Sequence, residues 1–290
     1  MSTIIGMAQD FVGSNNINLL LPNGQFGTRN QGGKDAASAR YIFTSLSSIN
    51  RYLFPREDDG LLDYLNEDGQ SIEPSWYVPI ILMVLVNGSE GIGTGWSFYI
   101  PNYNPRDMVA NVRRLLNDEH MEPMHPWYRG FKGTIEQTAS KEFGVTYTIT
   151  GTIEEVNETT LKIKELTIRR STQEYKEFLE SIITSNDSFI KEFKQFSDDK
   201  TVDFEVIVTV ENMMLAEQEG LLKKFKLTTT VSTSNVHLFD SRGVIKKYDT
   251  PEEKVRFILD VVKGDIIVNN RTVCCSLPCA ERERFYSFPK

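Results

Sequence analysis

The sequence has few of the residues that mark secreted, membrane-spanning or metal-binding proteins. Its 3 cysteines all lie near the end of the 290 residues, at Cys274, Cys275 and Cys279, so no disulfide framework can link the body of the chain. No apolar run approaches the roughly 20 residues that span a bilayer. The first residues lack the basic segment of a signal peptide. No Cys or His pair complements Cys275 and Cys279 at zinc-ligand spacing, so no metal site is predicted.

The chain also lacks an excess of basic residues, because its formal net charge is −8. That charge is unevenly distributed. Residues 1–56 carry a net charge of +3, whereas residues 57–100 carry −8 and contain no Lys or Arg. Phosphate binding depends on the local density of basic residues, so the total does not exclude a nucleic-acid partner. A solvated basic loop is the ordinary explanation for the first segment.

The apolar pattern predicts an α+β protein with a domain boundary near residues 123–130. Residues 12–39 read as a long loop, and residues 58–70 as an acidic surface segment. We predict helices over residues 3–11, 47–53, 104–116, 173–183, 211–220 and 255–262. We predict strands over residues 41–46, 79–86, 202–209, 226–231 and 236–239, with an antiparallel meander over 134–165.

The glycine-rich loop from Gly24 to Asp35 leads to Arg40 and Tyr41. Glycines allow a backbone to approach a phosphate closely, and Arg29 and Lys34 supply charge. A tyrosine hydroxyl has a pKa near ~10 and needs activation to act as a nucleophile. Arg40 would stabilise both a phenolate and a phosphoryl transition state. The alternative is that Tyr41 packs at the start of a strand.

A second glycine-rich segment, Gly91–Gly95, does not fit a dinucleotide-binding loop, since no suitable βαβ unit follows it. It fits a hairpin tip that presents Ile92, an apolar side chain of the kind that wedges between base pairs. The alternative reading of Ile92 is a core residue. The basic pairs, at residues 169–170, 223–224 and 246–247, are candidate phosphate contacts or solvated faces.

Four segments together resemble the eukaryotic type IIA DNA topoisomerases and are nearest to the plant forms. The segments are Gly6–Asn16, Gly24–Arg29, Gly32–Tyr41 and Asn87–Trp96. The resemblance extends from residue 2 to about residue 271. Departures from the family pattern include Thr167 and Ser171, which flank the basic pair at 169–170.

The resemblance implies that Tyr41 attacks a DNA phosphodiester and becomes joined to the 5′ end. Arg40 takes the role of the transition-state arginine, and Ile92 that of the isoleucine that bends DNA. The other DNA-binding residues implied are Arg29, Lys34, Thr94, Arg169 and Arg170. The implied organisation is a partial winged-helix domain over residues 1–122, an α/β tower domain over 123–250, and a short remnant over 251–290.

The resemblance also implies parts that these 290 residues lack. The ATPase domain, the metal-binding domain and the front of the winged helix would precede Met1, and a coiled-coil exit gate would follow Pro251. Mg²⁺ and ATP are therefore expected to act in the full enzyme, with none bound by this chain itself.

The expected partners are double-stranded DNA and the missing portion of the enzyme. Residues 24–40 are expected to make few buried contacts and to be loosely held without DNA or the missing portion of the enzyme. The full enzyme is expected to be a nuclear homodimer, and this chain a monomer.

Three hypotheses follow for the polypeptide itself. It is the DNA-cleaving piece of a topoisomerase, a DNA-binding module without catalysis, or an inactive truncated product. The absence of any Asp-x-Asp motif favours the second for the isolated chain.

Overall fold

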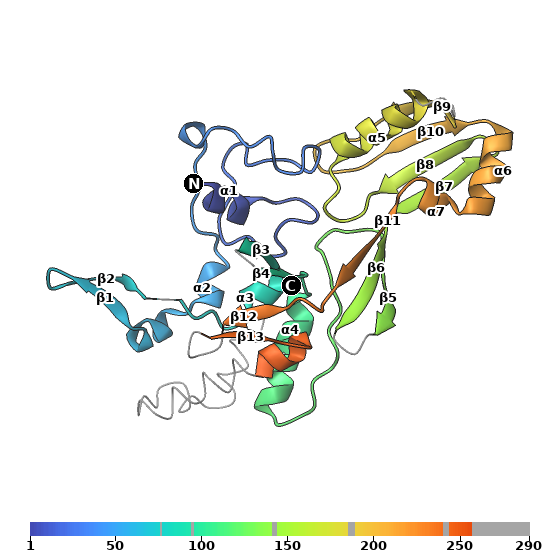
Figure 1. The fold of residues 1–290 in the computed structure, drawn as a ribbon. Helices are drawn as coiled ribbons and strands as arrows, with labels where there is room; N and C mark the ends of the chain where they lie inside the picture. The colour runs from blue at the N-terminus through green and yellow to red at the C-terminus, as the bar shows by residue number, and fades with distance from the viewer. Residues whose placement is uncertain (76, 94–95, 141–143, 185–188, 240–243, 257–290) are drawn as a thin grey trace.

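Three clusters of buried apolar side chains organise the chain, which a computed structural model describes over residues 1–75, 77–93, 96–140, 144–184, 189–239 and 244–256. Figure 1 shows helices and strands in separate small groups, so the fold is of the mixed α+β kind that the sequence predicts.

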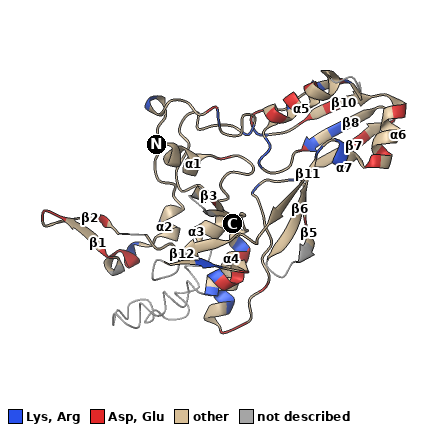
Figure 2. Cartoon of the chain, in the orientation of Figure 1, with Lys and Arg blue, Asp and Glu red and all other residues tan. Residues whose placement is uncertain are grey.

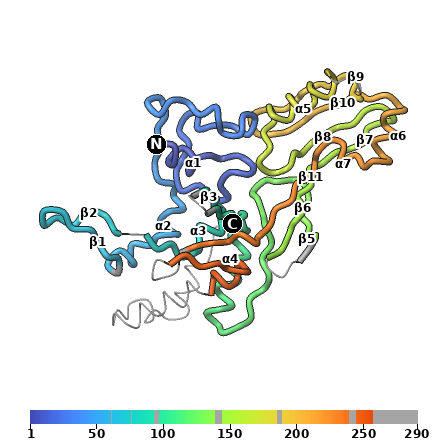
Figure 3. The backbone as a smooth tube through the Cα atoms, viewed as in Figure 1, coloured from blue at the N-terminus to red at the C-terminus, as the bar shows by residue number. Residues whose placement is uncertain are grey.

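The first unit holds the first cluster, in which Leu85 and Met108 are fully buried. Val236, Tyr248 and Val255 pack into the same cluster, although they come from the far end of the described chain. Figure 3 shows this late segment running back beside α3 and α4. The elements of this unit are α1 (Ser2–Ala8), η1 (Ala39–Tyr41), α2 (Asn50–Leu53), α3 (Met83–Val86), β3 (Ser89–Gly93), β4 (Trp96–Ile100), α4 (Pro105–Leu116), β12 (His237–Phe239) and β13 (Ile245–Lys247).

Helix α4 begins where the sequence predicts it. The side chain of Asn104 accepts a hydrogen bond from the Arg106 N–H at 2.9 Å, and Pro105 occupies the first turn, where a missing N–H costs nothing. Met108 and Val112, four residues apart, lie on one face and are buried in the first cluster.

The second unit is a four-stranded antiparallel sheet, in the order β7-β8-β10-β9, covered by helices. Its core includes Tyr175, whose hydroxyl donates to the Phe225 carbonyl at 3.1 Å. The elements are β7 (Thr152–Asn157), β8 (Thr160–Glu165), α5 (Thr172–Thr184), β9 (Ile190–Gln195), β10 (Phe204–Val208), α6 (Val210–Glu219) and α7 (Leu221–Lys224).

A three-stranded sheet, in the order β11-β6-β5, lies between the two units. It consists of β5 (Thr134–Ser140), β6 (Val145–Thr150) and β11 (Thr228–Ser232). The third cluster, Tyr128, Ile149 and Ile168, joins this sheet to the loops on both sides of it. These three side chains therefore connect the units through apolar contacts as well as through the chain.

A separate hairpin extends away from the first unit (Figure 1). It consists of β1 (Tyr64–Glu67) and β2 (Gln70–Pro74) and follows the 3₁₀ segment η2 (Arg56–Leu61). Acidic residues lie along this segment (Figure 2). The prediction of an acidic surface segment is confirmed, but its pairing into strands was not predicted from the sequence.

Several predicted elements differ in the structure. Residues 79–86 contain the short helix α3 where a strand is predicted, because a run that is apolar throughout has no periodicity to distinguish the two. The meander over 134–165 divides between two sheets at Gly151, where an added Cβ would clash with the Glu165 carbonyl. Strand β9 was not predicted.

The boundaries also differ from the predicted domains. Val236 and Tyr248, which the prediction assigns to the tower, and Val255, which it assigns to the remnant, contribute to the core of the first unit. The predicted helix over 255–262 begins earlier, with residues 251–256 helical, and its remainder lies outside the described residues.

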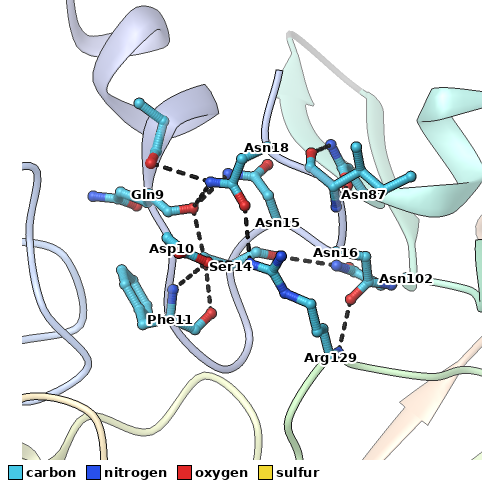
Figure 4. A network of polar contacts seen from close by, with 12 residues as sticks. Gln9, Asp10, Phe11, Ser14, Asn15, Asn16, Asn18, Asn87, Asn102 and Arg129 are labelled. Carbon is cyan, nitrogen blue, oxygen red and sulfur yellow. Dashed lines mark hydrogen bonds and ion pairs between the residues drawn. The ribbon is translucent and has the colours of Figure 1, made fainter. Parts of the chain in front are cut away.

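A network of asparagine side chains holds the loop after α1 (Figure 4). The buried Asn16 amide donates to the carbonyls of Val86, Tyr103 and Trp127 at 2.9, 3.0 and 3.0 Å. Its oxygen accepts from the Arg129 N–H at 2.9 Å. All four hydrogen bonds join segments distant in sequence, so one side chain links separate parts of the first unit.

Asn87 and Asn102 reinforce this loop. Asn87 exchanges two hydrogen bonds with the backbone of Ile17, each 2.9 Å long, and Asn102 donates to the Ser14 carbonyl at 3.0 Å. The loop is therefore held by side-chain amides in place of a regular ladder, which satisfies backbone groups that would otherwise be unpaired.

We predict that Asn16→Ala destabilises the chain strongly, because it leaves three carbonyls and one N–H without their partner. An unpaired buried polar group costs about 1–3 kcal/mol, so we expect a loss of at least about 3 kcal/mol in the free energy of unfolding. Urea unfolding followed by tryptophan fluorescence measures it. The control Asn66→Ala, on the exposed strand β1, should change stability by less than about 0.5 kcal/mol. Equal effects of the two substitutions would contradict the assignment.

Candidate functional site

Tyr41 lies at the end of the 3₁₀ turn η1 and is the most exposed tyrosine that the structure describes, at 70%. The Arg40 guanidinium carbon lies 5.7 Å from the centre of its ring. Tyr103, Tyr128 and Tyr175 are buried instead, and burial raises the pKa of each hydroxyl, which disfavours the phenolate. Tyr41 therefore combines accessibility with an adjacent cation, as a tyrosine nucleophile requires.

The segment after Tyr41 is not the predicted strand. It pairs with residues 20–23 through isolated bridges, in which Asn23 and Phe43 exchange backbone hydrogen bonds of 3.0 and 3.2 Å. Phe43 and Leu46 are 75% and 68% exposed. The alternation of apolar residues therefore does not reflect a buried face, and the residues next to Tyr41 form an apolar surface.

The loop before Tyr41 is held more firmly than the sequence predicts. The Gln9 amide donates to the carbonyls of Phe26 and Gly33 at 3.1 and 3.2 Å, and the Phe26 side chain is buried. Gly27 has φ +107°, and a Cβ there would lie 2.7 Å from the Gly33 Cα. The glycines thus allow two stretches of backbone to pack closely. The sequence, by contrast, predicts few buried contacts for this loop.

Asp35 closes the loop from within. Its carboxylate accepts from the Thr28 N–H at 2.8 Å and from the Thr28 hydroxyl at 2.7 Å. The Gln25 amide donates to the same carboxylate at 3.2 Å. Asp35 and Gln9 were not singled out as site residues, and their types and spacing contain no signal that would have identified them.

Arg29, one of the predicted DNA-binding residues, is not on the surface in this structure. Its side chain is buried and paired with the buried carboxylate of Glu165 in the second unit. Glu165 also accepts the backbone N–H groups of Lys132 and Leu166, at 3.2 and 3.0 Å. Arg29 therefore joins the loop to the second unit, and its charge is neutralised internally.

Lys34 remains on the surface, where its ammonium donates to Glu174 at 2.9 Å. That hydrogen bond raises the pKa of Lys34 and lowers the pKa of Glu174. With Arg40, which is also exposed, Lys34 supplies accessible positive charge on the loop from Gly24 to Tyr41, called here the Tyr41 loop.

Ile92 lies on β3, and its side chain is 95% exposed, so the alternative reading as a core residue is wrong. The neighbouring Gly91 accommodates the ring of Phe98, since a Cβ there would lie 2.6 Å from the ring. Phe98, the register partner of Gly91, therefore lies on the face of the hairpin opposite to that of Ile92. Thr94, the other predicted contact of this hairpin, lies outside the described residues.

Arg169 and Arg170 are both engaged by the protein. Arg169 forms an ion pair with Glu90 and lies over the ring of Tyr99, 4.4 Å from its centre. Arg170 donates to the Lys226 carbonyl at 3.0 Å and stacks on Tyr175. Burial lowers the pKa of Arg170, whereas Arg169 is half exposed. Of the two, Arg169 is better placed to meet a ligand.

The described residues contain no group of three or more His, Cys, Asp and Glu side chains arranged to hold a metal ion. None of the helices in the described ranges has both the length and the apolar character needed to cross a membrane.

Comparison with known proteins identifies the family. The family of the DNA gyrase/topoisomerase IV A-type subunit matches residues 1–272. The chain belongs to this family. It is 60% identical to DNA topoisomerase 2 of Arabidopsis thaliana and 58% identical to that of Pisum sativum, over 100% and 93% of its length. These matches span 22% and 21% of the relatives, so the chain covers about a fifth of the type II topoisomerases that it resembles.

A solved structure agrees in both sequence and fold. The DNA-binding, cleavage and re-ligation domain of Plasmodium falciparum topoisomerase II is 47% identical and superposes with a TM-score of 0.82. The match covers 88% of this chain and 34% of that one. The chain is therefore homologous to the DNA cleavage and re-ligation region of type II topoisomerases, and the resemblance of its motifs to that family is confirmed.

We predict that Arg29→Met is far more harmful to stability than Lys34→Met. The first variant leaves the buried Glu165 carboxylate without its partner, which costs about 3–5 kcal/mol. The second removes an exposed ion pair worth about 0–1 kcal/mol. Urea unfolding of both variants compares them, and a loss of less than about 1 kcal/mol for Arg29→Met would show that this pair is not a structural link.

Proposed function

We propose that this chain is the DNA-cleaving part of a type II topoisomerase, with Tyr41 as its nucleophile. The observation that carries the proposal is an exposed Tyr41 beside Arg40, on a loop anchored by Gln9 and Asp35. The identities to plant DNA topoisomerase 2 support it. In the full enzyme, transient cleavage of both DNA strands allows ATP-dependent passage of a second duplex and changes DNA topology.

The proposed step is a transesterification. The Tyr41 hydroxyl oxygen attacks a DNA phosphorus, loses its proton, and displaces the 3′ oxygen of the neighbouring nucleotide, which gains a proton. The product is a phosphodiester between Tyr41 and the 5′ end, and attack by the 3′ hydroxyl reverses the step. Arg40 stabilises the charge that develops on the phosphoryl oxygens, since a guanidinium binds two such oxygens at once.

The residues that the structure describes do not fit Mg²⁺. The described ranges contain no ligand cluster, and the whole sequence contains no Asp-x-Asp motif. We therefore assign Mg²⁺, and likewise ATP, to the remaining portion of the enzyme. We also propose a nuclear location, as the family implies.

We assign the first unit to a partial winged-helix domain and the second to a tower domain. Lys34 and Arg40 are the basic residues proposed to face double-stranded DNA, with Ile92 as the wedge that bends it. The exposure of Ile92 between glycine positions supports this role. Arg29 and Arg170 support the fold around these residues through their internal partners.

We predict that the 290-residue chain alone does not cleave DNA, and that mixing it with the metal-binding portion of a plant type II topoisomerase yields a covalent DNA adduct with Mg²⁺. Tyr41→Phe should abolish the adduct. Arg40→Ala should reduce its rate by about 10²–10³-fold, the usual effect of removing one transition-state donor. Denaturing electrophoresis with end-labelled DNA measures it.

The matched control is Tyr52→Phe, because Tyr52 is 56% exposed in the same unit. It should leave adduct formation unchanged. Metal-dependent nicking by the chain alone would contradict the assignment of the metal to the missing portion. If the mixture binds DNA but forms no adduct, the proposal is wrong and the chain is a DNA-binding module without catalysis.

We further predict that the chain by itself is monomeric at micromolar concentration. The resemblance places a long paired helix after Pro251, and its hydrophobic seam would supply most of the area that holds two copies together. Sedimentation velocity under reducing conditions should give the mass of one chain. A stable dimer would show that another surface carries association.

A further inference from the structure

The hairpin that carries Ile92 is held to the rest of the protein on two sides. On one side, the Tyr99 N–H donates to the Asn235 carbonyl at 3.0 Å, and the Asn235 amide donates to the Ser97 hydroxyl at 3.1 Å. On the other side, Arg169 reaches it from the loop between β8 and α5. The second attachment therefore comes from a loop of the second unit, whereas the hairpin belongs to the first.

Arg169 spans both strands of this hairpin. Its guanidinium pairs with Glu90 on β3 and lies over Tyr99 on β4, and these two residues are direct partners in the strand register. Ile92 lies two residues beyond Glu90, opposite Ser97. Because side chains two residues apart share a face of a strand, Arg169 covers the base of the face on which Ile92 lies.

The backbone at Arg169 adopts an unusual conformation that directs its side chain. Its φ is +72°, in the left-handed region that non-glycine residues rarely adopt. Gly13 lies against this turn, since a Cβ there would be 3.8 Å from the Arg169 nitrogen. Gly13 therefore borders the turn from which the Arg169 side chain reaches Glu90 and Tyr99 of the hairpin.

The Arg169 side chain contributes little to the core. It remains 52% exposed, and its partner Glu90 is 60% exposed. Two small hollows, of about 220 and 190 Å³, both include Arg169 and Tyr99 in their walls. Removing this side chain therefore detaches the hairpin at one point without opening a buried core.

We propose that Arg169 is a positioning residue, which holds the β3–β4 hairpin through Glu90 and Tyr99 so that Ile92 is oriented to enter DNA before DNA arrives. This inference rests on the proposed function for its DNA step. It differs from a phosphate contact, the role that the resemblance implies for Arg169. Here Arg169 acts through the protein, and Glu90 works with it.

The two roles give opposite results for Glu90→Gln. If Arg169 positions the hairpin, the loss of the Glu90 charge weakens the attachment and reduces DNA bending. If Arg169 binds phosphate, the same change frees the guanidinium, removes a repulsive charge and tightens DNA binding. Arg169→Asn serves as the second variant, because asparagine tolerates a positive φ and the turn should be retained.

Hydrogen exchange of the DNA-free chain tests the attachment itself. We expect the amides of residues 89–93 and 96–100 to exchange at least about threefold faster in Arg169→Asn and Glu90→Gln, since local opening sets such rates. Arg169→Lys keeps the charge but not the planar stacking, and should show an intermediate effect. The control Lys191→Gln removes one exposed charge on β9 and should have no effect there. Unchanged exchange in both hairpin variants would overturn the proposal.

DNA bending tests the consequence, with the chain mixed with the metal-binding portion and a short duplex labelled at both ends for energy transfer. At saturation we expect both variants to bend the duplex less, with Kd within about twofold of the unmodified chain. A phosphate contact would give a different result. Arg169→Asn would then bind DNA more weakly, with a slope of log K against log salt lower by about 1, and Glu90→Gln would bind more tightly. These outcomes would overturn the proposal. If the unmodified mixture binds no duplex, the proposed function fails, while hydrogen exchange still decides whether Arg169 holds the hairpin.

Discussion

The amide of Asn16 is the interaction on which most of the first unit depends. A single buried side chain contacts three carbonyls, which share its two amide hydrogens, and one N–H, from segments separated from it by 70 to 113 residues. Since an unpaired buried polar group is costly, these segments and the loop can be buried together only when this amide is in place. The same loop carries Gln9, whose amide holds the backbone at Phe26 and Gly33. The position of the Tyr41 loop therefore follows from the asparagine network.

A buried ion pair makes the second connection. Arg29, from the Tyr41 loop, meets Glu165 at the end of β8, so the loop is tied to both units. Buried pairs of this kind contribute little net stability compared with apolar packing, but breaking one is costly. The pair therefore specifies where the loop lies more than it stabilises the fold. Arg170 also has a structural contact within the protein, because it stacks on the rings of Tyr175 and Phe178 in the core of the second unit.

The residues left on the surface are those suited to meet DNA. Tyr41 and Ile92 are large side chains with 70% and 95% of their surface exposed, which costs hydrophobic free energy in the free protein. Each lies on an element too short to bury it, a 3₁₀ turn and a two-stranded hairpin. The surrounding loops are nevertheless anchored by hydrogen bonds. Such preorganisation lowers the ordering cost when a ligand binds.

The sequence by itself determined the elements whose signals are local. The Asn104 cap and Pro105 predicted the start of α4, and the apolar periodicity predicted α5, because capping and periodicity act over one or two turns. The motifs around Tyr41 and Ile92 also identified the family. Tertiary structure alone decided which basic side chains remain accessible to a ligand. Arg29 and Lys34 lie five residues apart on one loop, yet only Arg29 pairs with a buried carboxylate, that of Glu165, 136 residues away. It also decided that Tyr41, Phe43 and Leu46 stay exposed and that Val236, Tyr248 and Val255 return to the first core. Burial depends on contacts between distant segments, which no local pattern records.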